Sequence, residues 1–393
     1  MDVPFIQKHL AQLALDAWLL YDFQGLNPLA RGLAGLGERM LTRRWFCLVP
    51  AEGEVRWLVN QIEEAQFRDM PGKVRTFSSW TMLQTGLKEL LQGHRRVAME
   101  YTPHGTIPYV SRVDAGTLEL VRSTGVEIVS SADLVQWCEA RWSPGALATH
   151  LEAAKHLTVA RERAFHMVTQ SVRTGRRITE YDVQQEIVQY FELHNLTTSA
   201  PPIVAVGKHT SDPHYQPEKS SSALIEEGDL LLVDLWAKMR DSGAVYADIT
   251  WMAFVGGRVP DEFARVFAVV VRARDVAAEF VQQSVAKGER IRGYQVDDVA
   301  RTIIAEAGFG ERFIHRTGHN IGENDHGMGV NFDNLETHDE RMLIPDIACS
   351  IEPGIYLGIF GMRSEVNIYV GERRAEVTTM PVQRHVVPLL GDR

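Results

Sequence analysis

Residues 230–236 read LLLVDLW, and residues 245–251 read VYADITW. Each is an apolar run that contains a single acid, Asp234 in the first and Asp248 in the second, and the turn-forming sequence Asp241-Ser242-Gly243 lies between them. Short runs of this kind predict two strands, and the polar segment predicts that they form a hairpin. If the hairpin is symmetric about residue 241, the two aspartates are cross-strand neighbours with Cβ atoms about 5 Å apart.

An acid inside each strand is unusual, because strands normally avoid aspartate and like charges directly opposite each other destabilise a half-buried sheet. A divalent cation between the two carboxylates would remove this repulsion. The alternative interpretation is that one of the two acids caps a turn or faces water.

A second pair of acids lies nearer the end of the sequence. Glu352 lies in the segment CSIEPG, and Glu365 lies in the segment GMRSE. A hairpin that turns at Gly358-Ile359 would place these two carboxylates opposite each other as well. Arg363 precedes Glu365 by two positions and therefore lies on the same strand face. Taken alone, Glu365 and Arg363 are equally compatible with a solvated salt bridge.

Histidines are the third kind of candidate residue. The glycine-bracketed segment HRTGHNIG contains His315 and His319, while His326 follows seven residues after His319 and His214 lies in the segment DPHY. Glycines let a backbone pass close to a ligand without a Cβ clash. A single loop histidine is usually a surface or core residue, so none of these predicts a site by itself.

In combination, four carboxylates and one imidazole form a hard, oxygen-rich ligand set that suits a pair of manganese, cobalt or zinc ions. Four acids crowded into one pocket could not all ionise without such cations. Paired metal ions lower the pKa of a water between them and stabilise a hydrolytic transition state. The residues therefore predict metal-assisted hydrolysis.

The composition indicates an ordinary globular protein. The chain has 393 residues, of which 45% are hydrophobic and 23% charged, so it can bury a core in two or three domains. Its net charge of −10 excludes a general basic surface for nucleic acid or anionic lipid. Three cysteines (Cys47, Cys138 and Cys349) without a CxxC motif are typical of a reducing compartment. We therefore expect a cytoplasmic protein without a nucleic-acid or membrane partner.

The pattern of helices and strands predicts two domains. The first 140 residues mix apolar runs with helical stretches and predict a small α/β domain, and Ser143-Pro144-Gly145 is expected to end regular structure. We therefore place an N-terminal domain at residues 1–143 and a second domain at residues 150–393. The second is expected to contain amphipathic helices at 154–171, from Thr179, from Pro260 and at 295–307, with Gly308 as the stop signal of the last. It is also expected to contain β-rich runs at 230–237, 245–254, 347–357 and 362–370. Helices and antiparallel strands in separate runs predict an α+β fold.

With these residues the sequence resembles the pita-bread metallopeptidases, a family that includes methionine aminopeptidase, aminopeptidase P and prolidase. The family's ligand order of Asp, Asp, His, Glu, Glu falls on Asp234, Asp248, His319, Glu352 and Glu365. The short motifs around these ligands also match those of the family, namely Val-Asp, Asp-Ile-Thr, His-Arg-Thr-Gly-His, Glu-Pro-Gly-Ile-Tyr and Arg-x-Glu. The smaller N-terminal domain is typical of the aminopeptidase P and prolidase branch, which resembles creatinase in its two-domain layout.

The resemblance implies a role for each ligand. Asp248 and Glu365 would bridge two divalent metal ions, and Asp234 would bind one of them. His319 and Glu352 would bind the other. A hydroxide bridging the metals would attack the scissile carbonyl, with Glu352 as the proton shuttle.

The resemblance also implies substrate-side residues. His326 and His214 correspond to the histidines that hold the carbonyl oxygen and the developing oxyanion. His315 would shape the pocket, and Arg363 would contact the substrate. Trp236 would lie beside the metals, where the family has a small residue, so its bulk bears on substrate size.

Several positions depart from the family pattern without removing a ligand. The glycine usual after the ligand histidine is Asn320, and the glutamate usual after the second histidine is Gly327. The stretch that usually reads Arg-Ile-Glu-Asp is Arg363-Ser364-Glu365-Val366. The two aspartates lie fourteen positions apart, where the family commonly has eleven.

The resemblance favours a prolidase-like Xaa-Pro dipeptidase that acts as a homodimer, with manganese as the first metal and cobalt or zinc as alternatives. The alternative is an aminopeptidase P that cleaves longer proline-containing peptides. Arg363 or Arg341 could hold a substrate carboxylate in the dipeptidase. Two further alternatives are an inactive binding module, which typically loses metal ligands, and a creatinase-like amidinohydrolase, which needs no metal.

Overall fold

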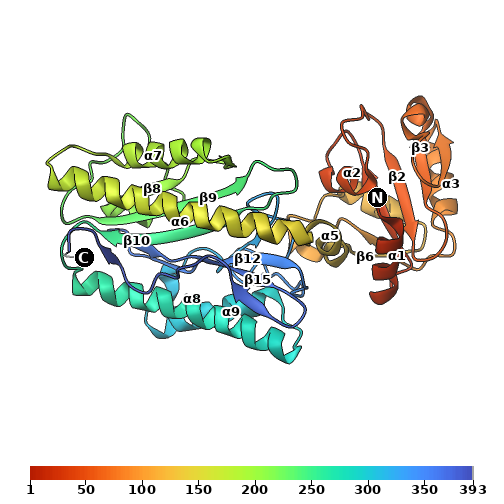
Figure 1. Cartoon of the computed structure of the whole chain (residues 1–393). Helices are drawn as coiled ribbons and strands as arrows, with labels where there is room; N and C mark the ends of the chain where they lie inside the picture. Colours follow the sequence, from red (N-terminus) through yellow and green to blue (C-terminus); the bar gives the residue numbers. More distant parts are fainter. Residues whose placement is uncertain (392–393) are drawn as a thin grey trace. The chain divides into compact units, whose positions relative to one another are not determined.

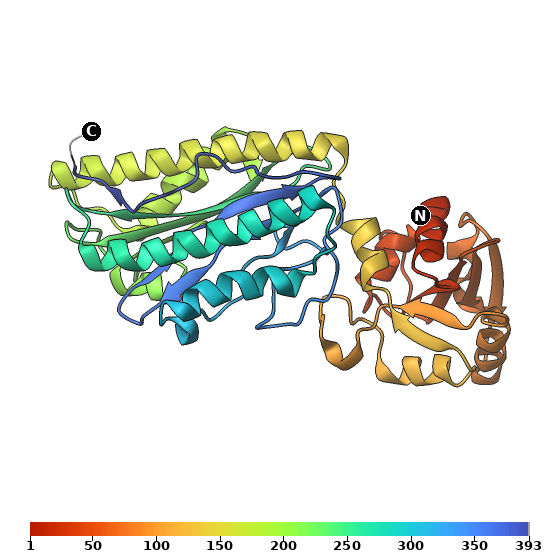
Figure 2. The same cartoon turned by 90° about the horizontal axis from the view of Figure 1, so that it is seen from below.

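The computed structural model describes residues 1–391, and the chain divides into two compact units, Met1–Glu139 and Ala140–Arg393. Figures 1 and 2 show the chain in two views. Each unit has its own hydrophobic core. Among the described residues, no helix is both long enough and apolar enough to cross a membrane.

The N-terminal unit is built around a six-stranded mixed sheet with the strand order β4-β3-β2-β1-β5-β6. Its strands are β1 (Ala17–Asp22), β2 (Trp45–Pro50), β3 (Arg56–Asn60), β4 (Lys73–Phe77), β5 (Arg96–Met99) and β6 (Glu127–Ser130). Its helices are α1 (Val3–Gln12), α2 (Pro28–Ala34), α3 (Trp80–Leu90), α4 (Ala115–Arg122) and α5 (Ala132–Glu139). The strands β1 to β3 pair in antiparallel fashion, and the other neighbours are parallel. The predicted α/β character of this part of the chain is confirmed.

The helices of the C-terminal unit are α6 (Pro144–Arg173), α7 (Glu180–Leu193), α8 (Asp261–Lys287) and α9 (Gly293–Glu306). A capping box begins α7, because the Thr179 hydroxyl accepts the Asp182 N–H at 3.2 Å and the Asp182 carboxylate accepts the Thr179 N–H at 2.9 Å. Gly308, with φ +85°, follows Ala307, the C-cap residue of α9. These start and stop signals agree with the sequence-based expectation.

The segment Ser143-Pro144-Gly145 does not end regular structure, as the sequence had suggested, but begins a helix of 30 residues. The Ser143 hydroxyl accepts the Ala146 N–H at 3.3 Å, and Pro144 is the first helical residue. Proline suits this position because the first turn of a helix leaves its N–H groups unpaired and proline has none to leave. The helix α6 therefore starts ten residues earlier than expected.

The strands of the C-terminal unit form two sheets and a hairpin. One sheet contains β7 (Leu196–Thr197), β8 (Ile203–Val206), β9 (Leu230–Met239), β10 (Ala247–Phe254) and β17 (Val387–Pro388). The other contains β11 (Asn320–Ile321), β12 (Ile347–Ile351), β15 (Val366–Val370) and β16 (Ala375–Val377), and the hairpin contains β13 (Gly354–Tyr356) and β14 (Gly361–Arg363). These strands lie between the helix pair α6 and α7 on one side and the pair α8 and α9 on the other (Figures 1 and 2). The α+β fold is therefore confirmed.

The register of the β9–β10 hairpin differs from the expected one. Asp234 lies opposite Thr250, and Asp248 lies opposite Trp236, so the two aspartates are diagonal rather than direct neighbours. The hairpin is symmetric about residue 242, in the middle of the turn sequence, instead of residue 241. A shift of two positions in the pairing keeps both acids on the same face of the sheet, because side chains alternate with a period of two.

Candidate metal centre

The residues singled out by the sequence come together in one cavity of the C-terminal unit, with a volume of about 680 Å³. All ten of them line it, namely His214, Asp234, Trp236, Asp248, His315, His319, His326, Glu352, Arg363 and Glu365. They come from segments up to 151 positions apart, so only the folded chain assembles this group.

The β9–β10 hairpin supplies the two aspartates, and both are buried in the finished fold. Thr250, opposite Asp234, places its hydroxyl 2.9 Å from Asp234 Oδ1 and 2.9 Å from Glu365 Oε2. The backbone N–H of Asp248 donates to Asn367 Oδ1 at 2.8 Å. Thr250 and Asn367 thus fix the hairpin against β15, which follows Glu365.

The second hairpin has the predicted register. Ile351 pairs with Val366 on one side, and Gly354 pairs with Arg363 on the other. The two pairings belong to the same register. Glu352 and Glu365, which lie between them in sequence, are therefore opposite each other. The chain turns at Gly358, whose φ is +83°. Glycine adopts this conformation without the strain that a Cβ would cause.

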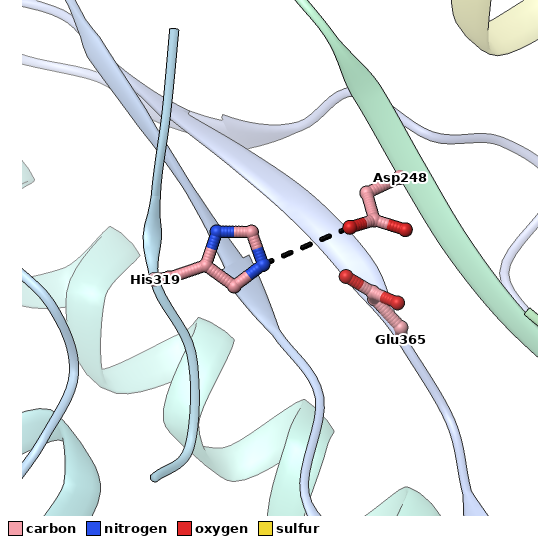
Figure 3. A group of neighbouring side chains, drawn as sticks. All are labelled: Asp248, His319 and Glu365. Carbon is pink, nitrogen blue, oxygen red and sulfur yellow. Dashed lines mark ion pairs between the residues drawn. The ribbon is translucent and has the colours of Figure 1, made fainter. Parts of the chain in front are cut away.

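His319 directly precedes β11 and approaches the acids from there. Its imidazole Nε2 lies 3.4 Å from Glu352 Oε1 and 3.7 Å from Asp248 Oδ2. Ligand atoms of Asp248, His319 and Glu365 all lie within 4.8 Å of one another (Figure 3). Gly318 permits this approach, because a Cβ at that position would lie 2.0 Å from the Ser350 carbonyl oxygen.

The electrostatics of the cluster fit a cation. Burial, followed by the charges of neighbouring acids, raises the pKa of Asp248 and of Glu365 well above their ordinary values. Burial also raises the pKa of Glu352 to about 7 and lowers the pKa of His319, so the imidazole is neutral, the form that binds metals. Asp248 Oδ1 and Glu365 Oε1 are buried and have no hydrogen-bond partner within residues 1–391. Buried carboxylate oxygens without a hydrogen-bond partner are the kind of ligand atom that a divalent cation requires.

Arg363 reaches the cavity, but the structure directs its N–H groups at protein acceptors. Its Nη2 lies 2.5 Å from Asp234 Oδ2, and its Nη1 donates to the Tyr356 hydroxyl at 3.0 Å. Its Nε donates to the Thr250 hydroxyl at 3.2 Å. Arg363 is therefore a buried partner of a predicted ligand. The other cation considered, Arg341, pairs with Asp339 at 2.6 Å and does not line the cavity.

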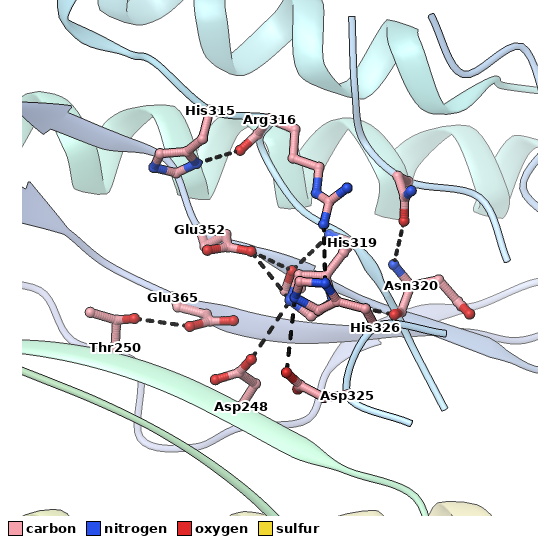
Figure 4. A network of polar contacts seen from close by, with 12 residues as sticks. Asp248, Thr250, His315, Arg316, His319, Asn320, Asp325, His326, Glu352 and Glu365 are labelled. Atoms are coloured by element: carbon pink, nitrogen blue, oxygen red, sulfur yellow. Dashed lines mark hydrogen bonds and ion pairs between the residues drawn. The ribbon is translucent and has the colours of Figure 1, made fainter. Parts of the chain in front are cut away.

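The three remaining histidines occupy different depths of the cavity. His315 is half-buried, and its Nε2 lies 2.8 Å from the Tyr356 hydroxyl. Burial, followed by the charge of Arg363, lowers the pKa of His315 to about 3. The ring of His326 lies 4.1 Å from that of His319, centroid to centroid (Figure 4). His214 and His326 are exposed at the cavity wall, where a ligand can reach them.

Trp236 lies directly across the hairpin from Asp248 and is half-buried. Its indole N–H donates to the Ser199 hydroxyl at 2.9 Å, which fixes the ring along one wall. Ala200 and Ile203 line the cavity as well, so this wall is largely apolar.

Sequence reasoning missed several residues of the site. Asp325 lines the cavity, and burial raises its pKa to about 6. Tyr356 links His315 to Arg363 through its hydroxyl group. Glu180, the first residue of α7, is fully buried and accepts the N–H groups of Val206 and Ala223. The proximity of Asp325 to His326 in the sequence was a usable signal, whereas nothing local marks Glu180.

Glu180 also receives two side chains from the segment that carries His214. His209 Nδ1 lies 2.9 Å from Glu180 Oε1, and the Tyr215 hydroxyl donates to Glu180 Oε2 at 2.7 Å. The rings of His209 and Tyr215 stack with centroids 4.3 Å apart. A single buried carboxylate therefore anchors the segment on both sides of His214.

Relatives share the sequence of this unit. A 243-residue segment is 31% identical to a probable dipeptidase PepE of Mycobacterium bovis, covering 61% of this chain and 60% of the relative. A 205-residue segment is 31% identical to an Xaa-Pro dipeptidase of Lactobacillus helveticus, covering 51% of this chain and 50% of the relative. The matched segments thus span between half and three fifths of these relatives.

Solved structures and family profiles agree with this similarity. The crystal structure of dipeptidase PepE from Mycobacterium ulcerans superposes with a TM-score of 0.68 at 24% identity, covering 98% of this chain and 97% of the other, which shows a common fold. The profile of metallopeptidase family M24 matches residues 150–372, a segment that contains every predicted ligand. The match covers more than half of the 393 residues, so the chain belongs to metallopeptidase family M24, as its sequence had predicted.

Proposed function

We propose that the protein is a metal-dependent dipeptidase that cleaves Xaa-Pro dipeptides. The observation that carries this proposal is the convergence of the five predicted ligands in one cavity, where Asp248 and Glu365 each keep a buried oxygen without a partner. Buried charges of one sign are costly unless a counter-charge compensates them. A pair of divalent ions would supply that compensation.

The ligand set suggests how the ions would be shared. Asp248 and Glu365 would bridge two ions, with manganese as the first candidate and cobalt or zinc as alternatives. Asp234 would hold one ion, and His319 with Glu352 would hold the other. When bound, such ions polarise a scissile carbonyl and make water a stronger nucleophile at neutral pH.

The remaining steps belong to side chains of this unit. Glu352 is placed to accept and return a proton, because its carboxylate lines the cavity beside His319 and its Oε1 accepts the Ser350 hydroxyl at 3.1 Å. His326 and His214, at the accessible wall, would hold the carbonyl oxygen and the charge that develops on it. Arg363 would hold the Asp234 carboxylate in position through its ion pair with it. His315 would orient the Tyr356 hydroxyl.

The choice of a dipeptide with proline in second position rests on the relatives and on the wall of the cavity. One relative is an Xaa-Pro dipeptidase, and another is a probable dipeptidase. Trp236, held by Ser199, gives the cavity a flat aromatic wall, against which a proline ring can pack.

Hydrolysis of Ala-Pro, Ala-Ala and Ala-Pro-Ala, with added manganese and after chelation, tests the proposal. We expect metal-dependent release of proline from Ala-Pro, slower cleavage of Ala-Ala and little cleavage of the tripeptide. Cleavage of the tripeptide alone would make the protein an aminopeptidase instead. Equal rates on Ala-Pro and Ala-Ala would remove the proline preference, and the Asp248→Asn variant is the inactive control.

A further inference from the structure

The cavity contains one acid, Asp325, that does not belong to the five predicted ligands. Its Oδ1 is buried and has no hydrogen-bond partner among the residues that the structure describes. Its Oδ2 lies 3.9 Å from His326 Nε2, too far for a hydrogen bond. The side chain is 17% exposed, as is that of Glu352, compared with 7% for Asp248.

The backbone that carries Asp325 is held in place by a departure from the family pattern. The Asn320 side chain accepts the Gly329 N–H at 2.8 Å and donates to the Ala348 carbonyl oxygen at 3.0 Å. The Asn320 carbonyl oxygen accepts the Gly327 N–H at 2.7 Å. A Cβ at Gly327 would lie only 2.3 Å from Asn320 Oδ1, so the asparagine requires glycine at that position. The two departures fit each other and fix the segment on which Asp325 lies.

The charges of His319 and Arg316 act favourably on the Asp325 carboxylate, yet its Oδ1 has no hydrogen-bond partner among the described residues. Two divalent ions would balance the four ligand carboxylates, and Arg363 also faces Asp234. Arg316 directs its Nη2 at His326 Nδ1, at 3.4 Å. A dipeptide brings one compact cation into such a site, its α-ammonium group, which has three donors and suits a carboxylate acceptor.

We propose that Asp325 binds the free α-ammonium group of the substrate and thereby selects peptides with an unblocked first residue. This assignment rests on the proposed peptidase function and adds a specificity-determining residue to it. Asp325 takes no part in the proton transfer, which Glu352 performs. The residue acts on substrate binding and leaves the metal ligands unchanged.

The test compares Ala-Pro with propionyl-proline, which has the same shape but lacks the amino group. We expect wild-type protein to prefer Ala-Pro and the Asp325→Asn variant to lose that preference by about 10- to 100-fold, mainly through a higher KM for Ala-Pro. The rate on propionyl-proline should stay unchanged. Glu323→Gln is the matched control, because Glu323 lies two residues away in the same segment, is exposed and does not line the cavity.

Two further measurements, of metal content and of substrate binding, separate a role of Asp325 in substrate binding from a role as a metal ligand. The metal-to-protein ratio, measured by mass spectrometry, should be equal in wild type and in Asp325→Asn, and a loss of metal would identify Asp325 as a ligand and overturn the assignment. An unchanged preference for Ala-Pro in Asp325→Asn would overturn it as well. If the wild type cleaves neither compound, the proposed function fails, and calorimetric binding of the two compounds then decides the role of Asp325. Weaker binding of Ala-Pro alone to the variant would support it, and equal binding would refute it.

Discussion

Replacing Gly318 by alanine should damage the metal centre without touching a ligand. The new Cβ would lie 2.0 Å from the Ser350 carbonyl oxygen, whereas ordinary contacts begin near 3.4 Å, so the two backbone segments must separate by about 1.4 Å. The neighbouring His319 and Ser350 are tied together by the Ser350 N–H, which donates to the His319 carbonyl oxygen at 2.8 Å, and by the Ser350 hydroxyl, which accepts the His319 N–H at 2.9 Å. The separation therefore moves the imidazole away from Glu352.

We expect Gly318→Ala to lower the free energy of unfolding by about 1 to 3 kcal/mol, the usual cost of overpacking. A ligand displaced by more than 1 Å should also reduce hydrolysis by about 100-fold. Urea denaturation and metal titration measure the two effects. Gly322→Ala is the control, because its nearest neighbour would lie 3.8 Å from the added Cβ. Equal stability and equal metal affinity in the two variants would refute the reasoning.

Three further predictions concern buried carboxylates. Asp248→Asn should abolish the rise in melting temperature that manganese gives to the wild type, because a ligand that binds only the folded state stabilises that state. An unchanged rise in melting temperature would contradict the assigned metal centre. Burial raises the pKa of Glu100 in the N-terminal unit from 4.5 to about 7, so the wild type should lose up to about 3 kcal/mol of stability as pH increases from 4.5 through 7. Glu100→Gln should flatten that dependence in urea titrations at pH 5 and 8, whereas exposed Glu119→Gln should keep it. Glu180→Ala should cost at least about 2 kcal/mol by leaving several buried groups unpaired, and should raise KM. Glu192→Ala, at an exposed position of α7, should do neither.

The sequence predicted one hairpin better than the other, and the turns explain why. The turn at Gly358-Ile359 is short, and a glycine with positive φ marks its centre, so the register of Glu352 and Glu365 follows directly. Between β9 and β10 the chain uses seven residues, 240–246, and such a loop does not determine the pairing to one position. The error of two positions left both aspartates on the same face, which is why the predicted ligand set was unaffected.

Residues that act through distant partners could not be predicted. Glu180 contacts Ala223, 43 positions away, and no local pattern distinguishes it from any other acid in the first turn of a helix. Pro144 was misread because proline both ends and begins helices, and only the capping by Ser143 decides between the two. The substitution of Asn320 for glycine was visible, but its fit with Gly327 depends on a contact that exists only in the folded loop.

The hydrogen bonds around the proposed metal centre leave several carboxylate oxygens available to a cation. Thr250 lies beside one oxygen each of Asp234 and Glu365, and the Ser350 hydroxyl donates to one oxygen of Glu352. These contacts hold the carboxylates in position but leave Glu365 Oε1 and Asp248 Oδ1 unpaired. Adding further protein donors would stabilise the apo fold and would also weaken cation binding, because each donor competes for the same lone pair. The unpaired oxygens are therefore a cost that cation binding at the proposed site would offset, and binding would then couple the stability of this unit to occupancy of that site.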